Sequence, residues 1–368
     1  MFQKITFTNY RIFAGKQELS LAPVTVVFGK NNVGKSALLK LPLLVSNIIA
    51  NHHEDGELFE KSIKGVRICE DYRDIVYGKG SRAVELSVTD GEYAMNLSFF
   101  VESQGRQRTH EEKRDFFQKE ISIDRQQVDI KKLLPCEIEY LKAIRKTPKD
   151  GYFTVTSFEN DVDPEGLFSY RRLVEDELNH SGILLQKISD WYNKTFDGWS
   201  VRVETLRAPI YSVTLNHGGI RSNIIDGGAG IAQSLPIMVS AATEALSSRL
   251  CIYEEPETHL HPEAHGAIAE FISNEAIESK GKKLFLIETH SVNFVLRLRT
   301  LIALGRLQPK DLALYYVDFD TEKEASTLRR IKVNTNGTVE GWPKDVFQET
   351  LQEARALREA QFKLEESK

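Results

Sequence analysis

"VVFGKNNVGKSALLKL", residues 26–41, decides the fold because it joins an apolar run to a helix-forming run through a loop that contains two glycines. Its middle follows G-x-x-x-x-G-K-[ST] without a mismatch. In such a loop backbone N–H groups turn towards phosphate oxygens, Lys35 reaches the outer phosphates and Ser36 ligates magnesium. We therefore expect a phosphate-binding loop between a buried strand and a helix. Its residues are Gly29, Lys30, Asn31, Asn32, Val33, Gly34, Lys35 and Ser36.

The composition is that of an ordinary globular chain. It has 368 residues, of which 41% are hydrophobic and 27% charged, enough for one large domain with an inserted lobe or for two domains. A net charge of -5 argues against coating nucleic acid through bulk charge, although a local basic groove is compatible with it. Three widely spaced cysteines without a C-x-x-C pair, and no apolar run of about 20 residues, favour a cytoplasmic protein without a membrane span.

Two adjacent carboxylates follow an apolar run in "RLCIYEEPETHLHPEAH", residues 249–265. Consecutive residues at the end of a strand point to opposite sides, so the two can have different roles. We expect Glu254 to hold the metal, through water, and Glu255 to be the general base for a water aligned on the terminal phosphate.

A second apolar run ends in polar residues in "KLFLIETHS", residues 283–291. A histidine at the end of such a strand is suited to hydrogen-bond the terminal phosphate, because imidazole is a donor near neutral pH. We predict this role for His290.

Glycines precede a helix-like run in "IIDGGAGIAQSLPIMVSAATEAL", residues 224–246. Free N–H groups at a helix start form an anion site, and a second such site is redundant for one nucleotide within one chain. We therefore expect Gly228 and Gly230 to serve the nucleotide of another subunit.

The remaining sequence predicts several elements. "AVELSV" and "YAMNLSFFV" flank "TDGE" and predict a β-hairpin within residues 83–101. "EIEYLKAI" and "RRLVEDELNHSGILLQKISDWY" predict helices, "WSVRVETL" and "IYSVTL" predict strands, and "YYVDFDTE" at 315–322 reads as a final strand.

The order of the loop at 29–36, "DGGAGIAQSLP", "YEEPETHLHP" and "ETHS" resembles the ABC-type ATPases of the RecF, SMC and OLD kind, often called AAA family ATPases. The opening "FTNYRIFAGKQELSLAPVTVVFGKNNVGKS" is similar to their usual N-terminal segment, and "NTNGTVEGWPKDVFQETLQEA" to a small C-terminal domain of unknown function found on some of them. The resemblance implies an α/β fold: an ABC-ATPase-like P-loop NTPase head, with a mixed sheet flanked by helices and an inserted, mainly helical lobe.

The resemblance also implies a division of the chain and roles for its residues. Residues 1–100 and 216–325 are the two halves of the head, 101–215 the variable lobe and 326–368 a small C-terminal segment. The loop at 29–36 is implied to be Walker A, Glu254 and Glu255 to close Walker B, and His290 to be the switch histidine. Gly228, Gly230 and Gln233 are implied to belong to the signature motif that caps ATP across a dimer.

The sequence departs from the family pattern at three points. Glu254 stands where an aspartate is usual, as is common in the OLD-like branch. Gly228 stands where the signature serine is usual, which removes a hydroxyl from the expected phosphate contact and implies slow turnover. The usual glutamine of the lobe has no clear counterpart, and residues 72–77 occupy about its region without one.

The leading hypothesis is a cytoplasmic Mg-ATP hydrolase that works as a homodimer or higher homo-oligomer. Only about 75 residues follow Ser291, too few for the Toprim nuclease domain of OLD-like proteins, so we expect a separately encoded nuclease or toxin as partner, as in bacterial antiphage systems. One alternative is a RecF-like DNA clamp that grips nucleic acid through Arg297, Arg299 and Arg306. Another is a nucleotide-gated scaffold with little turnover.

Two further readings carry less support from the sequence. His259, His261 and His265 together with Glu257 suit zinc or manganese as ligand types. An ABC transporter head fits least well, because the signature resembles the wrong branch.

Overall fold

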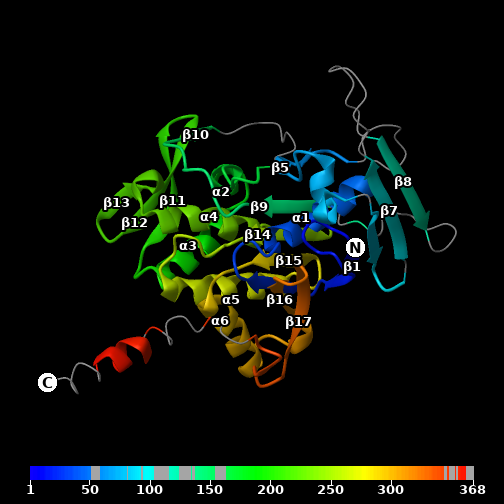
Figure 1. Cartoon of the computed structure of the whole chain (residues 1–368). Coiled ribbons are helices and arrows are strands. Elements are labelled where there is room, and N and C mark those ends of the chain that lie inside the picture. Colours follow the sequence, from blue (N-terminus) through cyan, green and yellow to red (C-terminus); the bar gives the residue numbers. More distant parts are fainter. Residues whose placement is uncertain are drawn as a thin grey trace.

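The computed structural model describes residues 1–50, 59–80, 82–92, 94–102, 116–123, 134, 137–153, 163–343, 346–347, 353 and 355–361. A seven-stranded sheet lies at its centre, and a five-stranded antiparallel sheet lies to one side (Figure 1). In spatial order the central strands are β18 (Val339–Glu340), β17 (Ala325–Val333), β16 (Leu312–Asp320), β3 (Val24–Gly29), β15 (Lys283–Glu288), β14 (Arg249–Glu254) and β9 (Glu137–Leu141). No helix among these residues is long and apolar enough to cross a membrane.

The middle of the central sheet is parallel and buried on both faces. β3 pairs in parallel with β15 on one side and β16 on the other, and β15 pairs in parallel with β14. Val26 and Phe28 pack into one hydrophobic core while Val27 packs into the other, as the alternation of side chains along a strand requires. The continuous apolar run before Gly29 therefore forms the doubly covered strand that the sequence predicts.

Helices cover both faces of this sheet. α1 (Lys35–Ala50) places its apolar side chains in the core that contains Val27. α4 (Ala229–Ala242), α5 (Pro262–Glu278) and α6 (Val292–Ala303) contribute to the opposite core. The predicted mixed sheet flanked by helices is confirmed.

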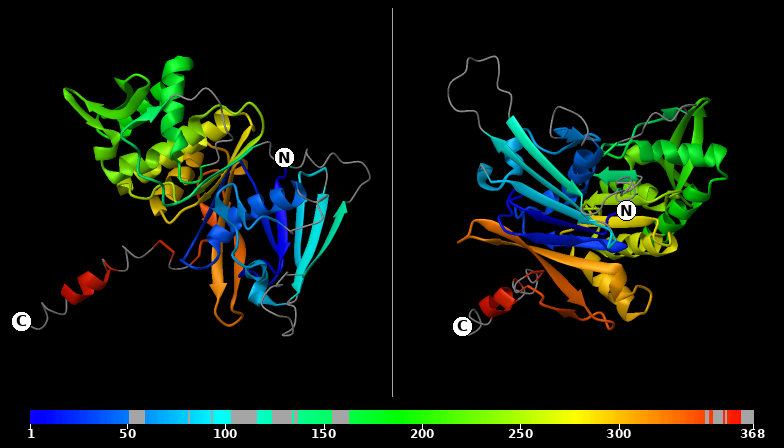
Figure 2. Two further views of the ribbon diagram at one scale, coloured as in Figure 1. Left: turned by 90° about the horizontal axis from the view of Figure 1, so that it is seen from above. Right: turned by 90° about the vertical axis from the view of Figure 1, so that its right-hand side faces the viewer.

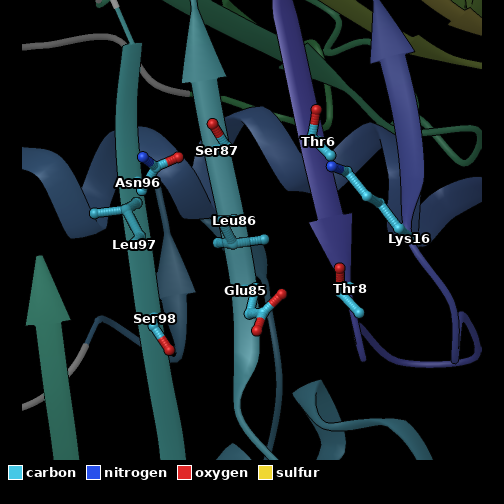
Figure 3. Close-up of a pocket in the computed structure, with 9 residues that line it drawn as sticks. All are labelled: Thr6, Thr8, Lys16, Glu85, Leu86, Ser87, Asn96, Leu97 and Ser98. Carbon is cyan, nitrogen blue, oxygen red and sulfur yellow. The ribbon is translucent and has the colours of Figure 1, made fainter. Parts of the chain in front are cut away.

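The five-stranded sheet packs its inner face against the core that contains α1. Its strands, in spatial order, are β2 (Gln17–Ser20), β1 (Lys4–Thr8), β6 (Val84–Thr89), β7 (Ala94–Glu102) and β8 (Phe116–Ile123). β6 and β7 pair as the antiparallel hairpin predicted from the sequence. The outer face carries short polar side chains such as Thr6, Ser87 and Asn96, which border a hollow of about 370 Å³ (Figure 3).

A third group of elements lies on the opposite side of the molecule from β6–β8 (Figures 1 and 2). It comprises α2 (Phe168–Asn179), α3 (Ile183–Thr195), β10 (Tyr152–Phe153), β11 (Ser200–Arg207), β12 (Ile210–His217) and β13 (Ile220–Asn223). The helices and the β11–β12 pair agree with the prediction. The described part of this group is nevertheless mixed and not mainly helical, because the strands β10 to β13 accompany the helices α2 and α3.

The helix predicted for "EIEYLKAI" is wrong. Glu137–Leu141 forms β9, which pairs in parallel with β14 at the edge of the central sheet. Ile138 and Leu141 are buried on opposite faces of the sheet, in the two different cores. Tertiary burial decides the conformation of so short a segment. The boundaries at residues 100, 215 and 325 stay predictions, although β9 joins part of the proposed lobe to the head.

The expectation that 315–322 is the final strand is also wrong. β17 continues the central sheet antiparallel to β16, and β18 follows it. At the start of β17, the Ser326 hydroxyl donates to the carbonyl of Val33 at 2.7 Å, and the Ser326 N–H donates to the carbonyl of Ile12 at 2.9 Å. The C-terminal strands thus support the phosphate-binding loop.

A buried ion pair holds β9 to β14. Arg249, 1% exposed, donates to a carboxylate oxygen of Glu139 and lies 3.2 Å from Glu137. Glu139 also accepts from the Ser240 hydroxyl at 2.6 Å, which connects the pair to α4. Burial pushes the pKa of Glu139 upward, but Arg249 and Arg172 together hold it below its ordinary value.

We predict that Glu139→Gln lowers the free energy of unfolding by about 3 kcal/mol, because it leaves Arg249 buried without its main counter-ion. Glu137→Gln is the control, since that side chain is 46% exposed, and should cost about 0.5 kcal/mol or less. Urea unfolding measures both. The Glu139 effect should be full above the ordinary pKa of 4.5 and shrink as the pH falls through the lowered native pKa. Equal costs for the two variants would contradict this account.

Candidate functional site

The carboxyl ends of three parallel strands meet at one edge of the central sheet. Val27 of β3 lies opposite Glu288 of β15, and Glu288 lies opposite Glu254 of β14. The loops that follow these strands are those predicted to hold phosphate, to carry the paired carboxylates and to carry the switch histidine. The order of the strands brings the three predicted loops together, as is usual for ligand sites in open α/β sheets.

The loop after β3 has the conformation that its glycines permit. Gly34 has φ +95°, and a Cβ there would lie 2.6 Å from Cγ2 of Ile12, so a larger residue is excluded. The Lys35 side chain is buried, and its ammonium donates to the carbonyl of Lys30 at 2.6 Å. Burial lowers the pKa of Lys35, while Glu288 and Glu255 raise it.

A pocket of about 480 Å³ opens between the three loops, within the range of roughly 300–1,000 Å³ for small-molecule sites. Lys35, Ser36, Glu255 and His290, predicted from separate stretches, all line it. The other residues of its wall are Arg11, Ile12, Asn31, Asn32, Gly34, Ala37 and Glu288.

Four residues of this pocket, Arg11, Ile12, Ala37 and Glu288, were not predicted from the sequence, and Glu288 is the carboxylate among them. The Ser36 hydroxyl donates to its Oε2 at 2.9 Å, and the Lys35 ammonium lies 3.7 Å from its Oε1. Burial raises the pKa of Glu288 to about 7, against the opposing effects of Lys35 and Ser36. The sequence contained a signal for Glu288. It is the last residue of the run "KLFLIE", just as Glu254 is the last residue of the run "RLCIYE".

Glu254 faces away from the phosphate-binding loop. Its carboxylate accepts from the hydroxyl of Tyr140 and from the N–H of Ala143 at 3.3 Å, both on the β9 side. The order of the strands explains why Glu288, and not Glu254, contacts Ser36. β15 lies between β3 and β14, so Glu288 is one strand nearer to Ser36. A metal role for Glu254 stays a prediction, and Glu288 is the carboxylate that contacts Ser36.

Glu255 and His290 face each other across the pocket. Nε2 of His290 lies 3.6 Å from Oε1 of Glu255 and 4.0 Å from Oε1 of Glu288. Burial and the charge of Lys35 lower the pKa of His290, while Glu255 raises it, so the imidazole is neutral at pH 7. Glu255 directly follows β14 and has φ +42°, and its side chain lines the pocket, whereas the carboxylate of Glu254 contacts Tyr140 and Ala143.

The Glu257 carboxylate holds the loop that carries His290. Its Oε1 accepts from the Thr289 hydroxyl at 2.6 Å and from the His290 N–H at 3.0 Å, while its buried Oε2 has no hydrogen-bond partner. Burial raises the pKa of Glu257. This carboxylate connects the loop after β14 to the loop after β15.

The described residues do not bring the other histidines together as a metal site. His265 is engaged by the Ser291 hydroxyl at 2.8 Å and the carbonyl of Leu260 at 3.0 Å, and His261 is exposed beside Glu263. Within this part of the chain the one group of three potential ligands is Glu255, Glu288 and His290, whose ligand atoms lie within 4.8 Å of one another. The oxygen ligands suit magnesium, and the alternative with His259, His261 and His265 is not supported.

The predicted signature residues lie at the start of α4 and do not line the pocket of their own chain. Gly228 is the N-cap, and a Cβ added there would meet nothing within 4 Å. A Cβ on Gly230 would lie 2.4 Å from the carbonyl of His259, so this glycine is required by packing within the chain. The Gln233 amide is paired with the backbone of Arg145, with N–H···O distances of 3.1 Å and 2.9 Å. Nucleotide contacts for these residues stay predictions.

We predict that Gly230→Ala lowers the free energy of unfolding by about 1–3 kcal/mol, because the methyl group overlaps a backbone carbonyl. Gly228→Ala should cost less than about 1 kcal/mol, since its site is open. Urea unfolding of the two variants compares the same change two residues apart. If Gly230→Ala has the wild-type free energy of unfolding, the backbone at His259 moves to admit the methyl group without cost, and this explanation is wrong.

No protein-family model and no curated protein matches the sequence. Solved structures do match. An SMC head bound to the C-winged helix domain of ScpA is 10% identical, with a TM-score of 0.52 over 90% of this chain and 98% of that chain. An SMC head from Pyrococcus furiosus, with an extended coiled coil and bound to the C-terminal domain of ScpA, is 10% identical, with a TM-score of 0.50 over 90% and 96%. The SMC head domain from Thermotoga maritima is 13% identical, with a TM-score of 0.44 over 90% and 99%. The chain has the mixed α/β fold of an SMC head domain.

Proposed function

We propose that this chain is a magnesium-dependent ATPase that binds ATP between the heads of two copies. The observation that carries the proposal is the pocket at the edge of the central sheet, where Lys35, Ser36, Glu255 and His290 meet. Four polar residues from three separate loops converge there, around a loop whose backbone suits phosphate. The SMC-like fold supports the same reading.

The reaction is phosphoryl transfer to water. The N–H groups of the loop at 29–36 and the ammonium of Lys35 bind the phosphates, and Ser36 with Glu288 would hold magnesium. Magnesium, when bound, neutralises charge on the phosphate oxygens. Glu255 orients a water and accepts its proton, and neutral His290 donates a hydrogen bond to the terminal phosphate.

The proposed dimer gives the exposed start of α4 a ligand. Gly228 is open to solvent on its side-chain face and does not line the pocket of its own chain. A helix N-terminus favours an anion. We assign this end of α4 to the nucleotide bound by the partner copy.

We further propose that nucleotide-driven closure controls a separately encoded protein partner, a nuclease or toxin of an antiphage system. The resemblance of the sequence to OLD-like ATPases supports this role. Two SMC heads of similar fold are bound to a ScpA domain, so this fold is able to present a docking surface to another protein.

The DNA-clamp alternative is weakened by the contacts of its arginines. Arg297 and Arg306 pair with Glu270 at 2.9 Å and 2.7 Å, and Arg299 donates to the carbonyl of Gly337 at 2.9 Å. A guanidinium that is already paired gains less from a phosphate contact.

We predict that Glu255→Gln lowers phosphate release by about 100-fold while it retains ATP, because the general base is removed and the phosphate contacts remain. Lys35→Ala should instead weaken ATP binding by about 10-fold or more. Phosphate release, binding of a fluorescent ATP analogue and light scattering distinguish the two, and Glu255→Gln should accumulate as a dimer with ATP. Glu263→Gln, 93% exposed in the same segment, is the control.

Full phosphate release by Glu255→Gln would overturn the hydrolytic assignment. A wild type that closes with ATP without releasing phosphate would favour the nucleotide-gated scaffold.

Substitutions of Glu288 and Glu254 are expected to change the magnesium requirement of phosphate release by different amounts. Because Glu288 contacts Ser36 and Glu254 contacts Tyr140, Glu288→Gln should raise the magnesium concentration for half-maximal phosphate release by about 10-fold. Glu254→Gln should leave it nearly unchanged. A magnesium titration at saturating ATP measures both. The reverse result would return the metal role to Glu254.

A further inference from the structure

Arg145 lies buried where the chain leaves β9, beside the pocket but not in its wall. It is 3% exposed, and its guanidinium donates to backbone carbonyls of three segments. Nη2 donates to the carbonyls of Glu255 at 2.8 Å and Glu254 at 3.2 Å, Nη1 to that of Gln233 at 2.8 Å, and Nε to that of Lys142 at 3.1 Å.

The contact with Gln233 is reciprocal. Oε1 of Gln233 accepts from the N–H of Arg145 at 3.1 Å, and its Nε2 donates to the carbonyl of Arg145 at 2.9 Å. We call these bonds, with the Nη1 bond to the Gln233 carbonyl, the Arg145–Gln233 clasp. Gln233 lies on the first turns of α4, so the clasp together with the Nη2 bonds of Arg145 connects this helix to the end of β14.

Close packing of the buried site around residue 145 does not by itself require an arginine. Its guanidinium is buried on carbonyl oxygens, and none of the hydrogen bonds found for it is to a carboxylate. Burial lowers the pKa of Arg145 to about 10, against the effects of Glu257, Tyr170, Glu255 and Glu254, so it stays charged at neutral pH. An apolar residue of similar size fills such a site at lower cost in free energy.

One of the carbonyls that Arg145 holds belongs to a residue in the left-handed region of backbone space. Glu255 adopts φ +42°, and its N–H donates to the carbonyl of Glu288 at 2.8 Å. Its own carbonyl accepts from Arg145 and from the N–H of Thr258 at 3.1 Å. These three bonds fix the peptide groups on both sides of Glu255 and so fix the direction of its side chain.

We infer that Arg145 is a positioning residue for Glu255 and that the Arg145–Gln233 clasp makes hydrolysis depend on the placement of α4. The inference rests on the proposed function, because it assigns a regulation to that site. When α4 contacts the nucleotide of the partner copy, the clasp transmits its position to the carbonyl of Glu255. Binding of ATP in the pocket of the same chain does not need the clasp, because Arg145 and Gln233 do not line that pocket and the Gln233 amide is bonded to the Arg145 backbone.

Steady-state kinetics on the full chain test the inference. Gln233→Ala and Arg145→Met should lower kcat by about 10- to 100-fold and change KM for ATP by less than about 3-fold, since misplacement of a catalytic group by about 1 Å has an effect of this size. Arg145→Lys should recover part of kcat. Gln186→Ala and Arg297→Met, on exposed helix faces, are matched controls and should keep wild-type kinetics.

Hydrogen exchange gives a second readout that does not depend on catalysis. The amide of Thr258 bonds to the carbonyl of Glu255, so its exchange should quicken in Gln233→Ala and stay at the wild-type rate in Gln186→Ala. If Arg145→Met is insoluble, Gln233→Ala and Arg145→Lys decide the question.

Three results would overturn the inference. The first is unchanged kcat in Gln233→Ala, and the second is a rise of KM alone. The third is loss of kcat with unchanged exchange at Thr258. If the wild type itself releases no phosphate, the proposed hydrolysis fails first, and faster exchange at Thr258 in Gln233→Ala would then show that the clasp still restrains the backbone.

Discussion

The parallel pairing of β3, β15 and β14 is the constraint on which the rest of the site depends. A parallel sheet aligns the carboxyl ends of its strands, so the loops after them share one edge. Here the register places Val27, Glu288 and Glu254 side by side. Every polar group of the pocket is held within one or two residues of such a strand end, or on the phosphate-binding loop itself and the N-terminal loop around Ile12. The rigidity of the doubly covered sheet therefore sets the geometry of the site.

Buried ionisable groups also lie around this edge, and specific partners hold them. Lys35 lies against the carbonyl of Lys30 and near Glu288, Arg145 lies on four carbonyls, and Glu257 holds the loop of His290. Charged groups in a low-dielectric interior are costly unless they are paired. Because several buried ionisable side chains are kept at this edge, we interpret it as a site that orients polar groups and not only as a packed interior.

Much of the fold was accessible from local pattern. The continuous apolar run at Val24–Phe28, the glycines after it and the Asp-Gly turn at 90–91 each indicate their own conformation, because burial, backbone freedom and turn geometry act over a few residues. "EIEYLKAI" was misread for the converse reason. A five-residue segment with three apolar side chains fits a strand or a helix turn equally well, and pairing with the edge of β14 made it a strand.

The sequence by itself singled out the loop at 29–36, the glutamate pair at 254–255 and the histidine at 290, since each pattern consists of residue types at short, fixed spacing. The strand order was decided only by the tertiary structure. That order puts β15 between β3 and β14, so Glu288 contacts Ser36 and Glu254 turns towards Tyr140. It also puts Arg145 against Gln233, 88 residues away. Periodicity describes which face of a strand is buried, but the neighbour of each strand follows from packing of the whole chain.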